Sequence, residues 1–288
     1  MTAWREGWDN AVARFSDRRV LGALLVASLL YSFAFVMLEG PLHRDWNVLE
    51  RAAEAAGTPE LYRYNGSTTY VWSPVAAYPL KIIAPLGVTA WRLILIATAL
   101  TLPTWRLRLL VLASVPFWVD MATGNLTILV FVSAVYALRG SPLGTASFFG
   151  FALLIPRPLF APMVLWLLWK RPGWRVPIAV AFGLHLVLVW WTGLGVMWIE
   201  TVLEIGPELQ GNLSNIGPSR LVGLWWLAAG IPLGAWLFSR GQLGWAGLAV
   251  SPYIWPYYLY WALPQVNLGG RRRVDEEEIG EHGSEPRH

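Results

Sequence analysis

The sequence contains no cysteine and few charged residues. Without cysteine there is no disulfide bond, no thiol catalysis and no thiolate-ligated metal. Charged residues make up 14% of the 288 positions, against roughly a quarter in soluble domains, so the chain cannot cover a surface that faces water on all sides. Its four histidines are dispersed, and it has no glycine-rich phosphate loop or nucleophile elbow. We therefore expect no metal, no other cofactor and no nucleotide site.

Hydrophobic residues, in contrast, make up 56% of the chain and gather in long blocks. A helix needs about 20 apolar residues to cross a bilayer, and residues 20–38, 176–191 and 221–238 approach that length. Backbone groups in lipid must be paired within their own segment, and the alternation of a membrane β-barrel is absent. These blocks therefore predict transmembrane helices.

Further apolar runs lie at residues 70–87, 91–102, 109–121, 126–138, 143–155, 159–169, 243–250 and 253–266. Several of them are too short to cross about 30 Å of hydrocarbon unaided. We therefore expect some spans to be broken or re-entrant helices that line a cavity enclosed by protein. The predicted fold is all-α, a polytopic transmembrane protein with about 8–10 spans.

The basic residues predict how the chain is oriented in a cell (plasma) membrane. They are scattered through short loops although the net charge is +4, so we expect no nucleic-acid partner. By the positive-inside rule, residues 1–19 form a cytoplasmic amphipathic segment, residues 20–268 the multi-pass domain, and residues 269–288 a disordered cytoplasmic tail. Residues 39–69 and 192–218 are then outer loops. The lone run between Gly87 and Arg106 conflicts with this alternation.

The first outer loop contains apolar residues at helical spacing: Trp46, Leu49, Ala53 and Ala56. This spacing predicts an amphipathic helix that ends at Gly57-Thr58-Pro59. Trp46 is one of 19 tryptophans, many of which lie near the ends of apolar runs. Anchoring at the membrane interface accounts for such residues in general, and stacking on a sugar ring is the functional alternative.

Asp45 is the first candidate for chemistry. It lies just past the first span, next to His43, Arg44 and Trp46. A carboxylate that is partly desolvated against the bilayer can act as a general base toward a hydroxyl group. The plainer alternative is that Asp45 caps a helix or is a solvated loop acid.

Arg157 is the second candidate, because prolines flank it on both sides between two apolar runs. This pattern predicts a broken segment with a cation at the break, which by the expected topology faces outward. An anionic ligand such as a lipid phosphate would explain a cation on that side, since the planar guanidinium suits phosphate. A loop arginine that extends to the membrane interface is the alternative.

Other polar residues are expected to face the same compartment as Asp45. Asn125 follows Asp120 and Gly124 at the outer end of a span, and Asn212 and Arg220 end the second outer loop. Capping and turn formation are the alternative roles for each of them. His185 lies in an apolar run, so we expect it to pack between helices or to bridge them.

Short motifs follow one another in order over most of residues 20–266. They are Asp45-Trp46, Arg51-Ala52-Ala53-Glu54-Ala55-Ala56-Gly57, Tyr70-Val71-Trp72-Ser73-Pro74, Gly124-Asn125-Leu126-Thr127, Arg157-Pro158, Asn212-Leu213-Ser214 with Arg220, and Ser251-Pro252-Tyr253-Ile254-Trp255. In this order they resemble the multi-span GT-C glycosyltransferases, and most closely glycosyltransferase family 87. That family contains bacterial mannosyltransferases that use polyprenyl-phosphate mannose.

The resemblance implies an inverting hexosyltransferase that acts at the outer face. The donor would be a polyprenyl-phosphate sugar, the acceptor a glycolipid or glycan, and membrane lipids would surround the protein. No metal would be required. The implied roles are general base for Asp45, donor-phosphate binding for Arg157 and Arg220, and substrate binding for Asn125, Asn212, Tyr258 and Trp46.

The chain departs from the family pattern at Tyr257-Tyr258, where a His-His pair is expected, and it is shorter than usual for the family. The alternative is therefore a non-catalytic membrane protein, either a carrier or flippase for lipid-linked sugars or a degenerate scaffold. A transporter would be expected to show internal repeats, and none is evident. A glycan ligase or polymerase would carry several arginines in a long outer loop, which this chain lacks.

Overall fold

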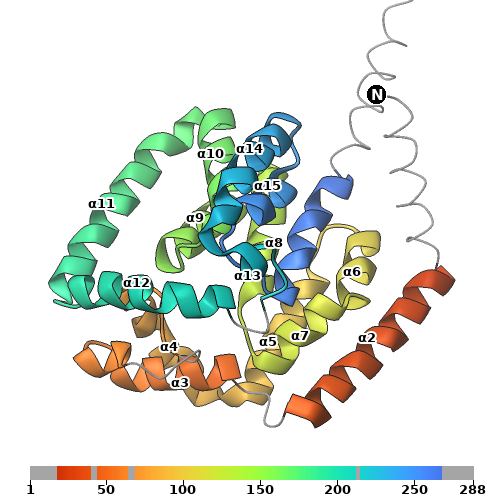
Figure 1. Ribbon diagram of the computed structural model, residues 1–288, viewed down its shortest axis with the longest axis horizontal. Coiled ribbons are helices and arrows are strands. Elements are labelled where there is room, and N and C mark those ends of the chain that lie inside the picture. Colours follow the sequence, from red (N-terminus) through yellow and green to blue (C-terminus); the bar gives the residue numbers. More distant parts are fainter. Residues whose placement is uncertain (1–17, 40–43, 64–68, 212–214, 268–288) are drawn as a thin grey trace, which may run out of the picture.

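The computed structural model describes residues 18–39, 44–63, 69–211 and 215–267, and every regular element within these ranges is helical (Figure 1). The all-α fold expected from the sequence is therefore confirmed. The expected N-terminal amphipathic segment, up to residue 17, and the C-terminal tail lie outside the described residues.

The α-helices are α2 (Arg18–Glu39), α3 (Arg44–Ala55), α4 (Ala77–Ile83), α5 (Gly87–Leu100), α6 (Trp105–Leu112), α7 (Val115–Thr123), α8 (Thr127–Leu138), α9 (Pro142–Leu154), α10 (Ala161–Lys170), α11 (Arg175–Trp191), α12 (Gly195–Gly211), α13 (Ser219–Val222), α14 (Trp226–Ser239) and α15 (Leu243–Val250). The 3₁₀ segments are η1 (Pro59–Tyr62), η2 (Pro74–Ala76), η3 (Ala84–Leu86), η4 (Pro158–Phe160), η5 (Pro172–Trp174), η6 (Gly223–Trp225) and η7 (Pro256–Asn267). The helix predicted from the spacing of Trp46 to Ala56 is present as α3, and the four residues of that spacing are buried.

Three stretches of the described chain are long and apolar enough to cross a membrane: Pro74–Leu100, Pro172–Trp191 and Ser219–Ser239. In the second of them, α11 exposes apolar side chains on almost every side, including Leu184 (60%) and Trp190 (85%). A helix that is apolar all round and not covered by protein is suited to contact with lipid. The structure is therefore compatible with a membrane protein.

The stretch Pro74–Leu100 joins two runs that the sequence separates. The sequence predicts one span ending near Gly87 and another run at residues 91–102, but the helical path continues from α4 through η3 into α5. Pro85 lies in this 3₁₀ turn, and Gly87 has a φ of 75° and a ψ of 160°, so the direction of the chain changes at the first residue of α5.

A break divides the predicted run at residues 109–121 into α6 and α7. Ser114 precedes α7, and its hydroxyl accepts the amide hydrogen of Phe117. The Ala113 carbonyl at the break accepts a hydrogen bond from Ser28 Oγ of α2 at 2.6 Å. The bond gives a partner to a carbonyl at the end of α6, and it ties α2 to the break.

The second predicted outer loop contains a helix that the sequence did not predict. In α12, Glu200, Glu204 and Glu208 are four residues apart and exposed, so they form one polar side. Trp198 Nε1 on the same helix donates to the Val71 carbonyl at 3.1 Å. Helices α3 and α12 both contact η1, and Figure 1 draws α12 above α3.

Helices α14 and α15 pack closely through glycine. A Cβ atom on Gly230 would overlap the Ala249 carbonyl oxygen, and one on Gly234 would overlap a methyl carbon of Val250. Small residues of this kind allow helix backbones to approach each other in a membrane, where no hydrophobic effect drives helices together. The α14–α15 pair supports the segment that leads into η7.

Replacing Gly230 by alanine should lower the free energy of unfolding by about 1–3 kcal/mol, because the added methyl group displaces the facing backbone. Gly183 in α11 is the matched control, since no atom lies within 4 Å of the position its Cβ would take. G183A should cause no loss, because alanine favours helix more than glycine does. Thermal unfolding in detergent measures both, and equal losses would contradict the close α14–α15 contact.

Candidate active site

Asn125 joins the segments that carry the candidate residues. Its Oδ1 accepts hydrogen bonds from the Thr127 amide at 3.1 Å and from Thr127 Oγ1 at 2.7 Å, which caps the start of α8. With the oxygen fixed in this way, Nδ2 points to the other side. It donates to Asp45 Oδ2 at 2.9 Å and to Tyr257 Oη at 3.1 Å. One amide therefore links a helix cap, a carboxylate and a phenol.

The turn between α7 and α8 brings Asn125 to this place. Gly124 has a φ of 75°, in the left-handed region, and a Cβ atom there would lie 2.9 Å from Cβ of Trp46. Glycine is thus required both by the backbone conformation and by the contact with α3. This contact sets the start of α3, and with it Asp45, directly against the turn.

Two residues of α5 that were not predicted from the sequence donate hydrogen bonds to carbonyls at the end of α7. Trp91 Nε1 donates to the Gly124 carbonyl at 2.9 Å. Arg92 donates from Nε to the Met121 carbonyl at 2.9 Å and from Nη2 to the Ala122 carbonyl at 2.8 Å. A cation at the C-terminal end of a helix is favourable and satisfies carbonyls that the helix leaves unpaired. The signal in the sequence was a lone arginine inside an apolar run.

Asp45 lies in the first turn of α3 and is partly buried. The positive end of the helix dipole favours the ionised carboxylate at this position, as does the hydrogen bond from Asn125. An ionised carboxylate is the form that accepts a proton. A position at the start of a helix was the plainer alternative for Asp45. This position is compatible with a role as a base.

Arg157 lies in extended backbone between α9 and η4, with φ −134° and ψ 136°. The broken segment predicted from its flanking prolines is therefore present. Its guanidinium carbon lies 5.2 Å from the centroid of the Tyr258 ring, within the range of a cation–π contact. Tyr258 directly follows Tyr257, which bonds to the same Asn125 amide as Asp45. The predicted base and the predicted phosphate ligand thus belong to one neighbourhood.

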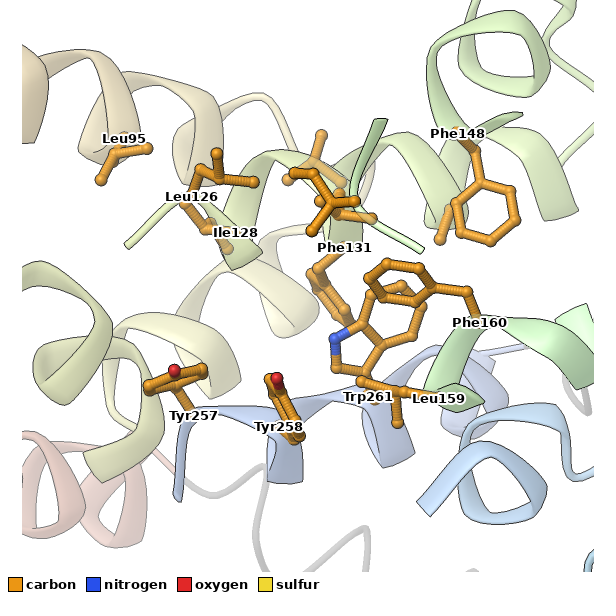
Figure 2. Close-up of a cluster of buried hydrophobic side chains, with 14 of the residues drawn as sticks. Leu95, Leu126, Ile128, Phe131, Phe148, Leu159, Phe160, Tyr257, Tyr258 and Trp261 are labelled. Carbon is orange, nitrogen blue, oxygen red and sulfur yellow. The ribbon is translucent and has the colours of Figure 1, made fainter. Parts of the chain in front are cut away.

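Helix η7 supplies the aromatic side of the site. Figure 2 shows Tyr257 and Tyr258 at the start of this helix and Trp261 further along, close to Phe131 and Phe160. Tyr258 is fully buried, and its hydroxyl has no hydrogen-bond partner among the described residues. Trp261 packs with its ring centroid 5.2 Å from that of Phe160.

Asp120 and Tyr260 also belong to the site, although the sequence analysis assigned neither a role. Asp120 is fully buried, and its Oδ2 accepts hydrogen bonds from Tyr260 Oη at 2.9 Å and from the Ile128 amide at 3.0 Å. The only sequence signal was a carboxylate at the end of an apolar run. Its pairing with a tyrosine 140 residues later has no local signature.

No protein-family model, curated protein or solved structure matches this chain. Its chemistry has to be inferred from its own residues.

The other predicted site residues lie as follows. Trp46 is buried, with its ring centroid 5.9 Å from that of Trp91. Arg220 is exposed in the short helix α13. Asn212 lies outside the described residues. Nearby, Asn215 was not predicted: its Oδ1 accepts the amide hydrogens of Gly217 and Ile254, each at 2.9 Å, and so ties the second outer loop to the segment before η7.

Two further polar pairs lie at the start of the Pro74–Leu100 stretch. Tyr62 Oη donates to the Trp72 carbonyl at 2.8 Å, and Tyr70 Oη donates to the Ser73 carbonyl at 3.2 Å. Burial raises the pKa of both phenols, so both remain hydrogen-bond donors. Ser73 Oγ lies 3.2 Å from His185 Nε2, which gives the histidine the bridging position between helices that the sequence suggested.

Replacing Asn125 by aspartate tests the link to Asp45. The variant keeps an oxygen that can cap α8 but turns a second oxygen toward Asp45 and Tyr257, where both donations are lost. Stability near neutral pH should fall by about 1–3 kcal/mol. The loss should shrink as the pH falls, because protonating one carboxyl removes the repulsion and restores a donor.

Thermal unfolding at neutral and acidic pH measures this effect. N47D is the control, because Asn47 lies in the same helix as Asp45 and is exposed. A loss in N125D no larger than in N47D, or one that does not depend on pH, would contradict the hydrogen bond between Asn125 and Asp45.

Proposed function

We propose that this chain is a membrane glycosyltransferase that transfers a hexose, mannose by preference, from a polyprenyl-phosphate sugar to a hydroxyl group of a glycolipid or glycan. The observation that carries the proposal is the hydrogen-bonded group of Asp45, Asn125 and Tyr257, with Arg157 against the ring of the adjacent Tyr258. A carboxylate, an amide, a phenol and a guanidinium from distant parts of the chain meet at one place. The resemblance of the motif order to glycosyltransferase family 87 supports the choice of donor.

In the proposed reaction, Asp45 accepts the proton of the acceptor hydroxyl group as its oxygen attacks the anomeric carbon. The bond from that oxygen to the carbon forms while the bond from the carbon to the phosphate oxygen breaks. The leaving lipid phosphate takes the electron pair of the broken bond, and the anomeric configuration inverts. Asn125 holds the carboxylate in position through the hydrogen bond to Oδ2.

Arg157 is the candidate ligand for the donor phosphate. The described residues place no carboxylate within ion-pair distance of its guanidinium, and its contact with the Tyr258 ring leaves the N–H groups at the guanidinium edge for an anion. A cation at this position would balance the negative charge that develops on the leaving phosphate. Arg220, Asn212, Tyr258 and Trp46 remain proposed contributors to substrate binding.

The exposed apolar helices support a substrate that carries a lipid chain. Leu184 and Trp190 of α11 and Leu221 and Trp225 near the start of the Ser219–Ser239 stretch are all largely exposed. In the proposed orientation, α3, α12 and Asp45 face the outer side of a plasma membrane and the N-terminus is cytoplasmic. The donor would then reach the site laterally from the bilayer, with its phosphate at the level of Asp45 and Arg157.

Replacing Asp45 by asparagine should lower the rate of hexose transfer by about a hundredfold to ten-thousandfold, because the base is lost while the side-chain shape is kept. Transfer from a polyprenyl-phosphate hexose to a glycolipid acceptor in reconstituted vesicles measures the rate. E54Q is the matched control, since Glu54 is exposed in the same helix. It should retain wild-type transfer.

Full activity in a folded D45N variant would contradict the proposed role of Asp45. Movement of the lipid-linked sugar across the vesicle membrane without any transfer would instead favour a carrier. The thermal unfolding of D45N, compared with the wild-type protein, shows whether a loss of transfer reflects a loss of fold.

Replacing Arg157 by glutamine should raise the KM for the donor by about tenfold, as expected from the loss of a charge-assisted hydrogen bond. The KM for the acceptor should change little. R63Q is the control, because Arg63 is exposed and pairs only across the surface with Glu60 at 3.4 Å. An unchanged donor KM in R157Q would contradict the assignment of Arg157 to the donor phosphate.

A further inference from the structure

Asp120 binds three elements at once. Its backbone carbonyl accepts the amide hydrogens of Gly124 at 3.0 Å and of Asn125 at 3.1 Å, which closes the turn after α7. Its carboxylate oxygen Oδ2 accepts from the Ile128 amide in the first turn of α8 and from Tyr260 of η7. The residue that shapes the turn carrying Asn125 is thus also the residue that holds η7.

Helix η7 depends on hydrogen bonds to other elements because of its geometry. It is a 3₁₀ helix of 12 residues, whereas 3₁₀ runs longer than about 3–4 residues are uncommon because their hydrogen bonds are poorer than those of an α-helix. Interactions with the rest of the protein must therefore maintain it. Its stabilising contacts include the hydrogen bonds of Tyr257 and Tyr260.

The 3₁₀ repeat of three residues per turn explains why these two tyrosines act together. Residues three apart lie one above the other, so Tyr257 and Tyr260 share one side of η7, and Tyr258 and Trp261 share another. The first side bonds to Asn125 and Asp120. The second side packs beneath Arg157 and against Phe160. A slip of one residue would rotate the helix by about 120° and bring the wrong pair to each partner.

We propose that the Asp120–Tyr260 pair is a positioning pair for the transfer reaction: it sets the register of η7 and so places Tyr257 on Asn125, which in turn orients Asp45. This inference rests on the proposed function. Asp120 and Tyr260 act through other residues and touch no reacting atom. The role is that of a hydrogen-bond acceptor, because both bonds end on the single oxygen Oδ2, while Oδ1 has no partner among the described residues.

An acceptor role and a charge role predict different results for the same substitution. Asparagine at position 120 is nearly the same shape and keeps one oxygen that can accept both bonds. D120N should therefore keep transfer within about threefold of wild type, whereas D120A and Y260F should lose about tenfold or more in kcat with little change in donor KM. Y62F is the matched control, because it also removes one buried tyrosine hydroxyl that donates a hydrogen bond, at 2.8 Å to Trp72.

Two results would overturn the inference. If D120N falls as far as D120A, the role depends on charge and the inference is overturned. If Y260F transfers as well as Y62F, the register does not matter to the reaction and the inference is again overturned. Y260F keeps the test valid should D120A fail to fold, because its side chain loses only the hydroxyl group.

A second measurement separates this inference from the proposed function. Melting temperatures of Y257F, Y260F and the double variant, in the absence of any substrate, report whether the two hydroxyl groups are coupled. The two losses should not add, whereas those of Y257F and Y62F should. Additive losses for Y257F and Y260F would overturn the register role even in an active enzyme. If the wild-type protein transfers no hexose but the losses in melting temperature of Y257F and Y260F are coupled, the proposed glycosyltransferase function is rejected and the register role is retained.

Discussion

A helix that breaks in apolar surroundings leaves backbone amides and carbonyls without partners, and this structure repeatedly satisfies them with polar side chains. Ser28 bonds the carbonyl at the break between α6 and α7. Arg92 bonds the carbonyls at the end of α7, and Asn125 caps the start of α8. Each of these side chains comes from, or holds, a different part of the chain. The hydrogen bonds that satisfy backbone groups at the helix breaks therefore also hold the tertiary structure together.

The candidate site follows from this constraint. Asn125 has one oxygen and two amide hydrogens, and capping α8 uses only the oxygen. The hydrogens are then available to Asp45 and Tyr257, which are 80 and 132 residues away in sequence. Asp120 has a similar double use, since its carbonyl closes the turn while its carboxylate binds η7. Each of these hydrogen bonds holds its two partners in one relative arrangement.

Local patterns in the sequence were sufficient for some parts of the fold. The spacing of Trp46, Leu49, Ala53 and Ala56 predicted α3, because one buried face of a helix repeats every three to four residues. The prolines around Arg157 predicted the break between α9 and α10, since proline restricts its own backbone and that of its predecessor. Both features depend on neighbours within a few residues.

Other parts depended on information that local patterns do not contain. Pro85 and Gly87 predicted a helix end, and Gly87 does leave the helical conformation, but the sequence did not show that α5 follows without a loop. Residues 192–218 were predicted to form an outer loop, although the spacing of Glu200, Glu204 and Glu208 also suits the polar side of a helix. The pairing of Asp120 with Tyr260 spans 140 residues, and no periodicity or motif connects them. Arg92 was visible as a charge in an apolar run, but its partners were not.

The position of η7 in the chain has a consequence for how the protein is made. A ribosome synthesises η7 after all other described helices, and both of its hydrogen bonds to the α7–α8 turn close loops of more than a hundred residues. Contacts between residues so far apart in sequence form late in folding, because the loop-closure entropy must be overcome first. The other described helices can thus form while Asn125 and Asp120 still lack their tyrosines. During biosynthesis, the candidate site is completed only when nearly all of the described chain is in place.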